Sequence, residues 1–261
     1  NTATGELLPD TLSPNRYGSF SWLNDNSGFY YGSYAPVEKG QELKATTYFQ
    51  KLYFHKMGTP QSEDYVVYER PDNKEYFNGA QVSEDGNWLI ITVGKGTERM
   101  NMVYFKNLTM GKAPIMPIVE NLNNSWDFIG NDGSVFYFET DKDASRGKVV
   151  KVDALAQQNG WTDVIPESAD TLTGVSFINN QFVLNYLKDA ATQIKIYETN
   201  GKFARDVKLP GIGSAGGFGG KRSYTEAFYS YSSFNAPPTI YRYDLKTGKS
   251  TLFRQSSVKF D

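Results

Sequence analysis

The sequence predicts an all-β protein, a β-propeller with about five blades of four antiparallel strands each. Three observations predict this fold. Aromatic residues make up 15% of the 261 residues, with 18 Tyr, 17 Phe and 4 Trp, and aromatic side chains favour strands. Amphipathic helical patterns are nearly absent. A unit of strands and turns also recurs along the chain, and a period of about 40–50 residues with four strands per unit is typical of propeller blades.

The strands are predicted by short segments rich in β-branched and aromatic residues, with turn residues between them. In order along the chain, the clearest segments are 28–32, 51–55, 65–68, 88–93, 102–105, 135–138, 148–152, 182–186, 193–197 and 240–243. The best helical candidate, residues 152–158, is short and does not change the predicted fold class.

A polar turn centred on Gly or Asn marks each copy of the repeat. These turns lie at residues 25–28, 84–86, 131–133, 179–181 and, more weakly, 221–223. They divide one propeller domain into repeat units at roughly 17–70, 76–120, 125–166, 173–209 and 216–255. Within the units, Asn200-Gly201 fits a primed two-residue hairpin turn, and residues 246–248 are similar.

The alternative to a propeller is a β-sandwich or a large barrel. A four-stranded twisted sheet cannot bury both of its faces alone, whereas radial stacking buries them against neighbouring sheets. A sandwich does not predict five regular copies, so the repeat favours the propeller. Residues 1–16 resemble the outer edge of a preceding blade, and the chain stops just after an outer strand near Phe253. We therefore interpret the sequence as a propeller fragment.

Composition argues against several classes of function. The net charge is −2, from 27 basic and 29 acidic residues, and no Lys/Arg cluster offers a nucleic acid a basic face. Cysteine is absent and histidine occurs once, which argues against disulfides, thiolate chemistry and a zinc site. Apolar runs are too short for a membrane-spanning helix. The start has neither a signal-peptide pattern nor a Met, which suggests a trimmed or internal fragment. We expect no cofactor, metal, nucleic acid or membrane partner.

We searched the sequence for two motifs, the GxSxG of α/β-hydrolases and the GxGxxG of dinucleotide-binding folds. No serine has Gly at both the −2 and +2 positions, so the nucleophile elbow of α/β-hydrolases is absent. A GxGxxG pattern occurs at Gly211, Gly213 and Gly216, but not within a βαβ unit. We interpret it as an interblade loop that leads into an inner strand, rather than as a dinucleotide site.

The remaining polar and aromatic candidates favour structural roles. His55 is the only imidazole available as a base, and its strand context predicts a structural, partly exposed side chain. Most Asp residues flank turns, where they bond their own backbone, and a glycosidase-type pair cannot be identified from spacing. Tyrosines and phenylalanines within strands are expected to pack between blades; they are Tyr30, Tyr53, Tyr68, Phe105, Tyr137, Tyr197 and Tyr241.

Four segments resemble the propeller of the prolyl oligopeptidase family. They are residues 50–64, 77–89, 20–25 and 241–245, and the resemblance runs in order over essentially the whole chain. The Gly-Thr-x-x-x-x-Asp element within 50–64 is also shared with oligopeptidase B, so it marks only the broader family. Residues 77–89 favour the prolyl enzymes.

The resemblance implies a function for the parent protein. In this family, a seven-bladed propeller caps an α/β-hydrolase domain with a Ser-Asp-His triad, and it admits short peptides while excluding folded proteins. The parent is therefore expected to be a serine-type prolyl endopeptidase. The present sequence lacks the hydrolase part and about two blades. We expect it to carry no catalytic residue and to be inactive alone. The expected partners are short proline-containing peptides and the parent's hydrolase domain.

The resemblance also implies a substrate-binding contribution from the propeller. The family forms an apolar subsite for the residue two positions upstream of the proline, and its contributors match Tyr17, Phe77 and Thr97. Phe77 replaces a Met and stiffens the pocket, Thr97 replaces a Cys, and Gly94 stands where the family has an Arg. The alternative role for Tyr17 and Phe77 is packing between blades.

Two alternatives and two further expectations remain open at this stage. The chain could instead be a stand-alone propeller scaffold for protein or peptide binding, or the propeller of an oligopeptidase B-like peptidase. Five blades would close into a smaller ring, or would associate with other copies through open, apolar blade faces. The expected location is the cytoplasm, with the periplasm as the alternative.

Overall fold

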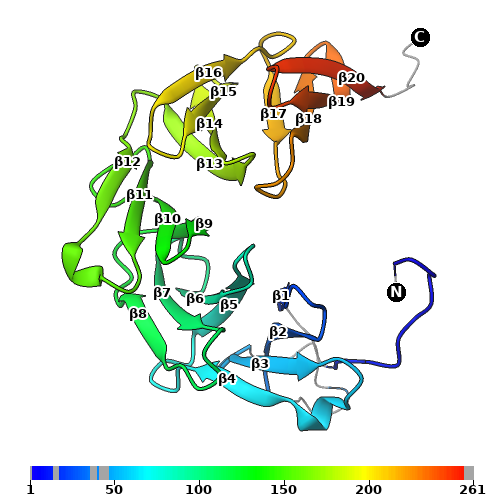
Figure 1. Cartoon of the computed structure of the whole chain (residues 1–261), viewed down its shortest axis with the longest axis vertical. Coiled ribbons are helices and arrows are strands. Elements are labelled where there is room, and N and C mark those ends of the chain that lie inside the picture. The colour runs from blue at the N-terminus through cyan, green and yellow to red at the C-terminus, as the bar shows by residue number, and fades with distance from the viewer. Residues whose placement is uncertain (1, 14–17, 36–39, 41–46, 256–261) are drawn as a thin grey trace. The chain divides into compact units, whose positions relative to one another are not determined.

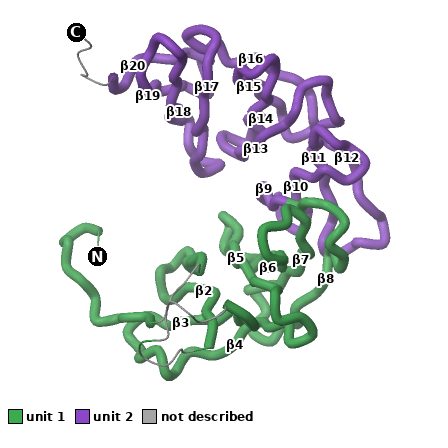
Figure 2. Tube along the Cα trace, turned by 180° about the vertical axis from the view of Figure 1, so that it is seen from behind, with its two compact units in different colours: residues 1–126 green, residues 127–261 purple. Residues whose placement is uncertain are grey.

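The computed structural model describes residues 2–13, 18–35, 40 and 47–255. Among these residues, twenty strands form five sheets, each with four antiparallel strands in sequential order (Figure 1). This architecture confirms the predicted all-β class with four-stranded blades. The chain divides into two compact units, residues 1–126 and 127–261 (Figure 2), which we describe separately.

The first unit holds two sheets, which we name blades A and B. Blade A consists of β1 (Phe20–Trp22), β2 (Gly28–Ser33), β3 (Lys51–Lys56) and β4 (Tyr65–Glu69). Blade B consists of β5 (Tyr76–Val82), β6 (Trp88–Lys95), β7 (Asn101–Asn107) and β8 (Ile115–Val119). The core between them contains Tyr30 and Leu52 from blade A and Leu89, Ile91 and Val93 from blade B.

The second unit holds three sheets, blades C, D and E. Blade C consists of β9 (Trp126–Asp132), β10 (Val135–Thr140), β11 (Lys148–Asp153) and β12 (Thr162–Ile165). Blade D consists of β13 (Thr171–Ile178), β14 (Gln181–Lys188), β15 (Ala191–Glu198) and β16 (Phe203–Val207). Blade E consists of β17 (Ser214–Gly217), β18 (Glu226–Ser233), β19 (Ala236–Asp244) and β20 (Lys249–Gln255).

Apolar faces join neighbouring blades within the second unit. Between blades C and D, the Tyr137 ring lies 5.7 Å from Phe177 and 5.1 Å from Phe182, measured between centroids. Between blades D and E, the core contains Ile178, Val183 and Tyr229. Strand tyrosines therefore do pack between blades, because alternate side chains of a strand leave opposite faces of the sheet. Closure of the five blades into a ring stays a prediction.

Two local predictions were wrong. The helical candidate at 152–158 overlaps the end of β11, and only Gln157–Asn159 forms a 3-10 turn, η2. At Asn200-Gly201 only the glycine has a positive φ, of 84°, whereas a type I′ turn requires it at both positions. Type I′ conditions are instead met at Asn179-Asn180, with φ of 53° and 52° between β13 and β14.

The structure contains little helix. The two 3-10 turns, η1 (Gln61–Glu63) and η2, are three residues each. In the described part of the chain, no helix has the length and apolar character needed to cross a membrane.

Candidate functional site

Phe77, a predicted substrate-binding residue, lies at the start of β5. It pairs across the sheet with Gly94 on β6. A Cβ atom on Gly94 would lie 2.4 Å from Cζ of Phe77, so the aromatic ring occupies the space that any other side chain would need. The ring is not fully covered, since 37% of Phe77 remains exposed. The absence of a side chain at Gly94 thus makes room for the Phe77 ring.

Thr97 lies in the turn that follows β6 and is exposed. Gly96, just before it, has a φ of 56°. Because the start of β5 and the end of β6 are adjacent in an antiparallel pair, Phe77 and Thr97 lie at the same end of blade B. Tyr17 lies outside the described residues. The assignment of all three residues to a substrate subsite stays a prediction.

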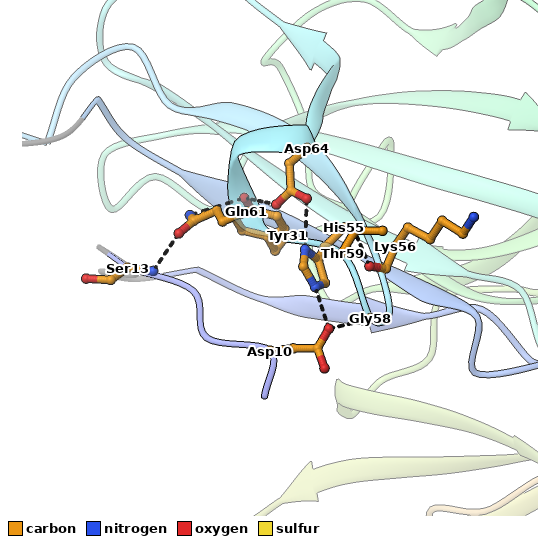
Figure 3. Close-up of polar contacts among 9 residues, drawn as sticks. All are labelled: Asp10, Ser13, Tyr31, His55, Lys56, Gly58, Thr59, Gln61 and Asp64. Carbon is orange, nitrogen blue, oxygen red and sulfur yellow. Dashed lines mark hydrogen bonds and ion pairs between the residues drawn. The ribbon is translucent and has the colours of Figure 1, made fainter. Parts of the chain in front are cut away.

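His55 on β3 is the centre of a buried polar cluster that was not predicted from the sequence. Its side chain is 1% exposed, so the prediction of a partly exposed position was wrong. Nδ1 lies 2.8 Å from Oδ1 of Asp64, and Nε2 lies 3.3 Å from Oδ1 of Asp10 (Figure 3). Each ring nitrogen therefore faces a carboxylate.

Further donors hold the two carboxylates in place. The Tyr31 hydroxyl donates to Oδ2 of Asp64 over 2.7 Å, and the Gly58 N–H donates to Oδ1 of Asp10 over 2.6 Å. The Gly58 hydrogen bond holds the pKa of Asp10 below its usual value, because a donor to the charged form favours that form. Burial, followed by the bond to Asp64, raises the pKa of Tyr31.

This arrangement orients side chains but offers no nucleophile to the imidazole. In a Ser-His pair, one ring nitrogen faces the hydroxyl that it activates, whereas both nitrogens of His55 face Asp oxygens. Among residues 2–13, 18–35, 40 and 47–255, no group of three or more His, Asp or Glu side chains could hold a metal. The Gly58-to-Asp64 spacing was visible in the sequence, but Asp10 had no signal.

A second polar site lies on blade C. Glu139 on β10 is partly buried, and burial, followed by the charge of Asp127 on β9, raises its pKa to about 7. Burial also raises the pKa of Asp127, with the charge of Asp141 as a second cause. Burial raises the pKa of Tyr186 on blade D, and the charge of Glu139 is a minor further cause. No sequence pattern pointed to this pair either.

The glycine-rich stretch lies where a loop was expected. Residues 211–213 precede β17, the first strand of blade E. Gly211 and Ile212 line an open pocket of about 510 Å³ with Lys188 and Lys195 of blade D. No helix follows the glycines, so the phosphate-binding geometry of a dinucleotide fold is missing from this part of the structure.

Fold and side chains together define a β-propeller module with buried polar side chains on its blades. The family model for the N-terminal β-propeller domain of prolyl oligopeptidase matches residues 1–256. The chain therefore belongs to the prolyl oligopeptidase N-terminal β-propeller family.

Curated relatives and solved structures agree with this assignment. The prolyl endopeptidase of Elizabethkingia meningoseptica is 35% identical over 259 residues, which cover 99% of this chain and 36% of that protein. A solved prolyl endopeptidase structure matches with a TM-score of 0.87 and 33% identity, covering 99% of this chain and 37% of that one. Prolyl oligopeptidase B of Galerina marginata, bound to a 35mer hydrolysis and macrocyclization substrate, matches with a TM-score of 0.87 and 28% identity, covering 98% and 36%. The chain thus spans about a third of the length of these relatives.

Proposed function

We propose that this propeller gates access to the active site of a serine peptidase that cleaves short peptides after proline. The supporting observation is the match to prolyl endopeptidase over 99% of the chain at 35% identity. In this proposal the Ser-Asp-His triad belongs to an α/β-hydrolase domain of the parent protein. The propeller excludes folded proteins by size and is inactive alone.

The proposal of inactivity has support from the residues themselves. The sequence contains no GxSxG element, and its one histidine is buried with carboxylates at both nitrogens. Since a triad needs a nucleophile within hydrogen-bond reach of its base, His55 is a poor candidate for that base.

Phe77, Thr97 and Tyr17 are proposed to contribute an apolar subsite for the side chain two positions upstream of the proline. The support for Phe77 is that its ring sits over Gly94 and remains 37% exposed. A flat, partly exposed aromatic ring can contact a substrate side chain without rearrangement.

A fluorogenic assay with a Gly-Pro reporter peptide tests the central proposal. We expect cleavage by the full-length parent and none by the 261-residue chain. Cleavage by the chain alone would overturn the gating proposal and direct attention to a base around His55. If neither cleaves it, an Arg-Arg reporter separates an oligopeptidase B-like enzyme from a stand-alone binding scaffold.

The subsite is tested by Phe77→Ala in the full-length parent. We expect kcat/KM for an apolar peptide to fall about tenfold through a higher KM with little change in kcat, because apolar contact binds ground and transition states alike. Phe203→Ala is the matched control, since Phe203 is also an exposed phenylalanine, on β16. Equal kinetics for both variants would remove Phe77 from the subsite.

The cytoplasm is proposed as the location of the parent protein, with the periplasm as the alternative. Fractionation of cells that express the full-length parent, followed by the Gly-Pro assay on each fraction, distinguishes the two.

A further inference from the structure

The N-terminal segment, residues 9–13, is attached to blade A by three polar contacts, two made by Asp10 and one by Ser13. Asp10 accepts a hydrogen bond from the Gly58 N–H and faces Nε2 of His55. The Ser13 N–H donates to Oε1 of Gln61 over 3.0 Å. Gly58 and Gln61 both lie in the connection between β3 and β4, so the segment crosses this end of the blade, as Figure 3 shows.

The number of protons on His55 determines how well it can hold this segment. A neutral imidazole has one N–H and one lone pair, whereas an imidazolium has two N–H groups. Asp64 is the nearer carboxylate, at 2.8 Å against 3.3 Å for Asp10. If the single N–H of a neutral ring points to Asp64, the lone pair of Nε2 faces the Asp10 carboxylate and repels it.

When Nε2 of His55 carries no proton, no other group around the ring donates to Asp10 in its place. From the connection before β4, Asp64 contributes a negative charge, and from β2, Tyr31 donates its hydroxyl to Asp64 rather than to Asp10. The Phe29 ring on β2, 5.1 Å from the imidazole, is uncharged. Lys56, next along β3, is exposed and points away from the imidazole in Figure 3. With a neutral His55, Asp10 therefore keeps the Gly58 N–H but loses its donor at Nε2.

We propose that His55 is a proton-dependent anchor for residues 9–13. When both of its nitrogens are protonated it binds Asp10 and keeps this segment on blade A, and when it is neutral this contact weakens. The device does not depend on the proposed peptidase function. The segment is therefore held more firmly at low pH than at high pH. The direction follows from Asp10, which needs a cation or a second donor at Nε2.

Hydrogen exchange at single amides of the full-length parent tests whether the contact between His55 and Asp10 depends on pH. The reporters are the Gly58 and Ser13 amides, and the Ser27 amide is the internal control, because its acceptor is Asp25 and not a carboxylate that faces His55. After correction for intrinsic exchange, we expect Gly58 and Ser13 protection to fall roughly tenfold from about pH 5.5 to 8.5, as expected for loss of one charge-assisted hydrogen bond. Ser27 protection should stay constant.

Two variants and a matched control complete the test. Asp10→Asn and His55→Gln should each abolish the fall in protection, while Asp25→Asn should retain it at Gly58. Asp10 lies on a surface segment, so its variant decides the question even if His55→Gln fails to fold. Protection at Gly58 that is independent of pH in the natural sequence, or an unchanged pH profile in Asp10→Asn, would overturn the proposal.

Discussion

Two groups of acidic residues differ in what surrounds them. One is the pair of carboxylates around His55 in blade A, and the other is Glu139 with Asp127 in blade C. In blade A, an imidazole, a phenol hydroxyl and a backbone N–H surround Asp64 and Asp10. In blade C, burial and a neighbouring carboxyl raise the pKa of Glu139 to about 7.

The difference shows that depth of burial alone does not describe the environment of an acid. Asp64 is 3% exposed, and two partners from separate strands face its oxygens, Nδ1 of His55 and the Tyr31 hydroxyl. Glu139 is less deeply buried, but its neighbouring charge has the same sign. Burial disfavours the charged form, and donors restore it only where the fold supplies them. Four substitutions test this contrast, from the largest expected effect on stability to the smallest.

Asp64→Ala should reduce the free energy of unfolding of the chain by about 2–6 kcal/mol, because it leaves two buried donors unsatisfied at about 1–3 kcal/mol each. It leaves Nδ1 of His55 and the Tyr31 hydroxyl without their acceptor. Urea unfolding measures the loss. Asp72→Ala is the control, since Asp72 pairs with Arg70 while 55% exposed, and it should cost less than about 1 kcal/mol. Similar losses in both variants would contradict the contrast between buried and exposed pairs.

Glu139→Gln should stabilise the protein at pH 8 by about 1–3 kcal/mol, a range reduced for the partial exposure of Glu139. The folded-state pKa is raised from 4.5 to about 7, so the folded state binds the proton more tightly than the unfolded chain. Stability is therefore lost as pH rises from about 4.5 to about 7. Urea unfolding at several pH values should show this loss only with Glu139 present. The exposed Glu120→Gln should keep the natural profile, and a flat profile in the natural sequence would be the contrary result.

Tyr31→Phe should reduce the free energy of unfolding by about 1–2 kcal/mol, because it removes one donor to the Asp64 carboxylate. The stacking of the ring on Tyr53, at 5.5 Å between centroids, should remain. Tyr229→Phe is the comparison, since its hydroxyl donates to the neutral Ser250 over 3.0 Å. We expect the smaller loss there, and the opposite order would argue against the role of the carboxylate charge.

Asp127→Asn should lower the pKa of Glu139 while leaving it above the ordinary value. The like charge of Asp127 is the second cause of the raised pKa, after burial. The midpoint of the pH-dependent stability loss measures this change, which should be smaller than the effect of Glu139→Gln. A midpoint that does not move would mean that burial acts alone.

Much of the fold could be predicted because its signals are local. Residues 28–32 and 88–93 carry strand-forming side chains between polar turns, and both lie within observed strands, β2 and β6. Turn geometry was less predictable. Asn200-Gly201 has the composition of a primed turn, but Asn179-Asn180 adopts its φ values, because loop length and strand register also select the turn.

Phe77 and Gly94 were assigned from the resemblance to the family, and the structure adds how they pair. Phe77 and Gly94 pair directly across two strands joined by one turn. By contrast, Asp10 is 45 residues from His55 in sequence, and Glu139 acts on Tyr186 from another blade. No pattern within one strand could connect these residues.

The sequence by itself determined the strands, the turns between them and the repeat that makes five four-stranded sheets, since alternation and turn chemistry act over a few residues. Only the tertiary structure decided which acids are paired with donors and which are left beside another acid. Those environments arise where segments distant in the chain pack together, and the energy of a buried charge depends on whichever groups that packing brings within hydrogen-bond distance.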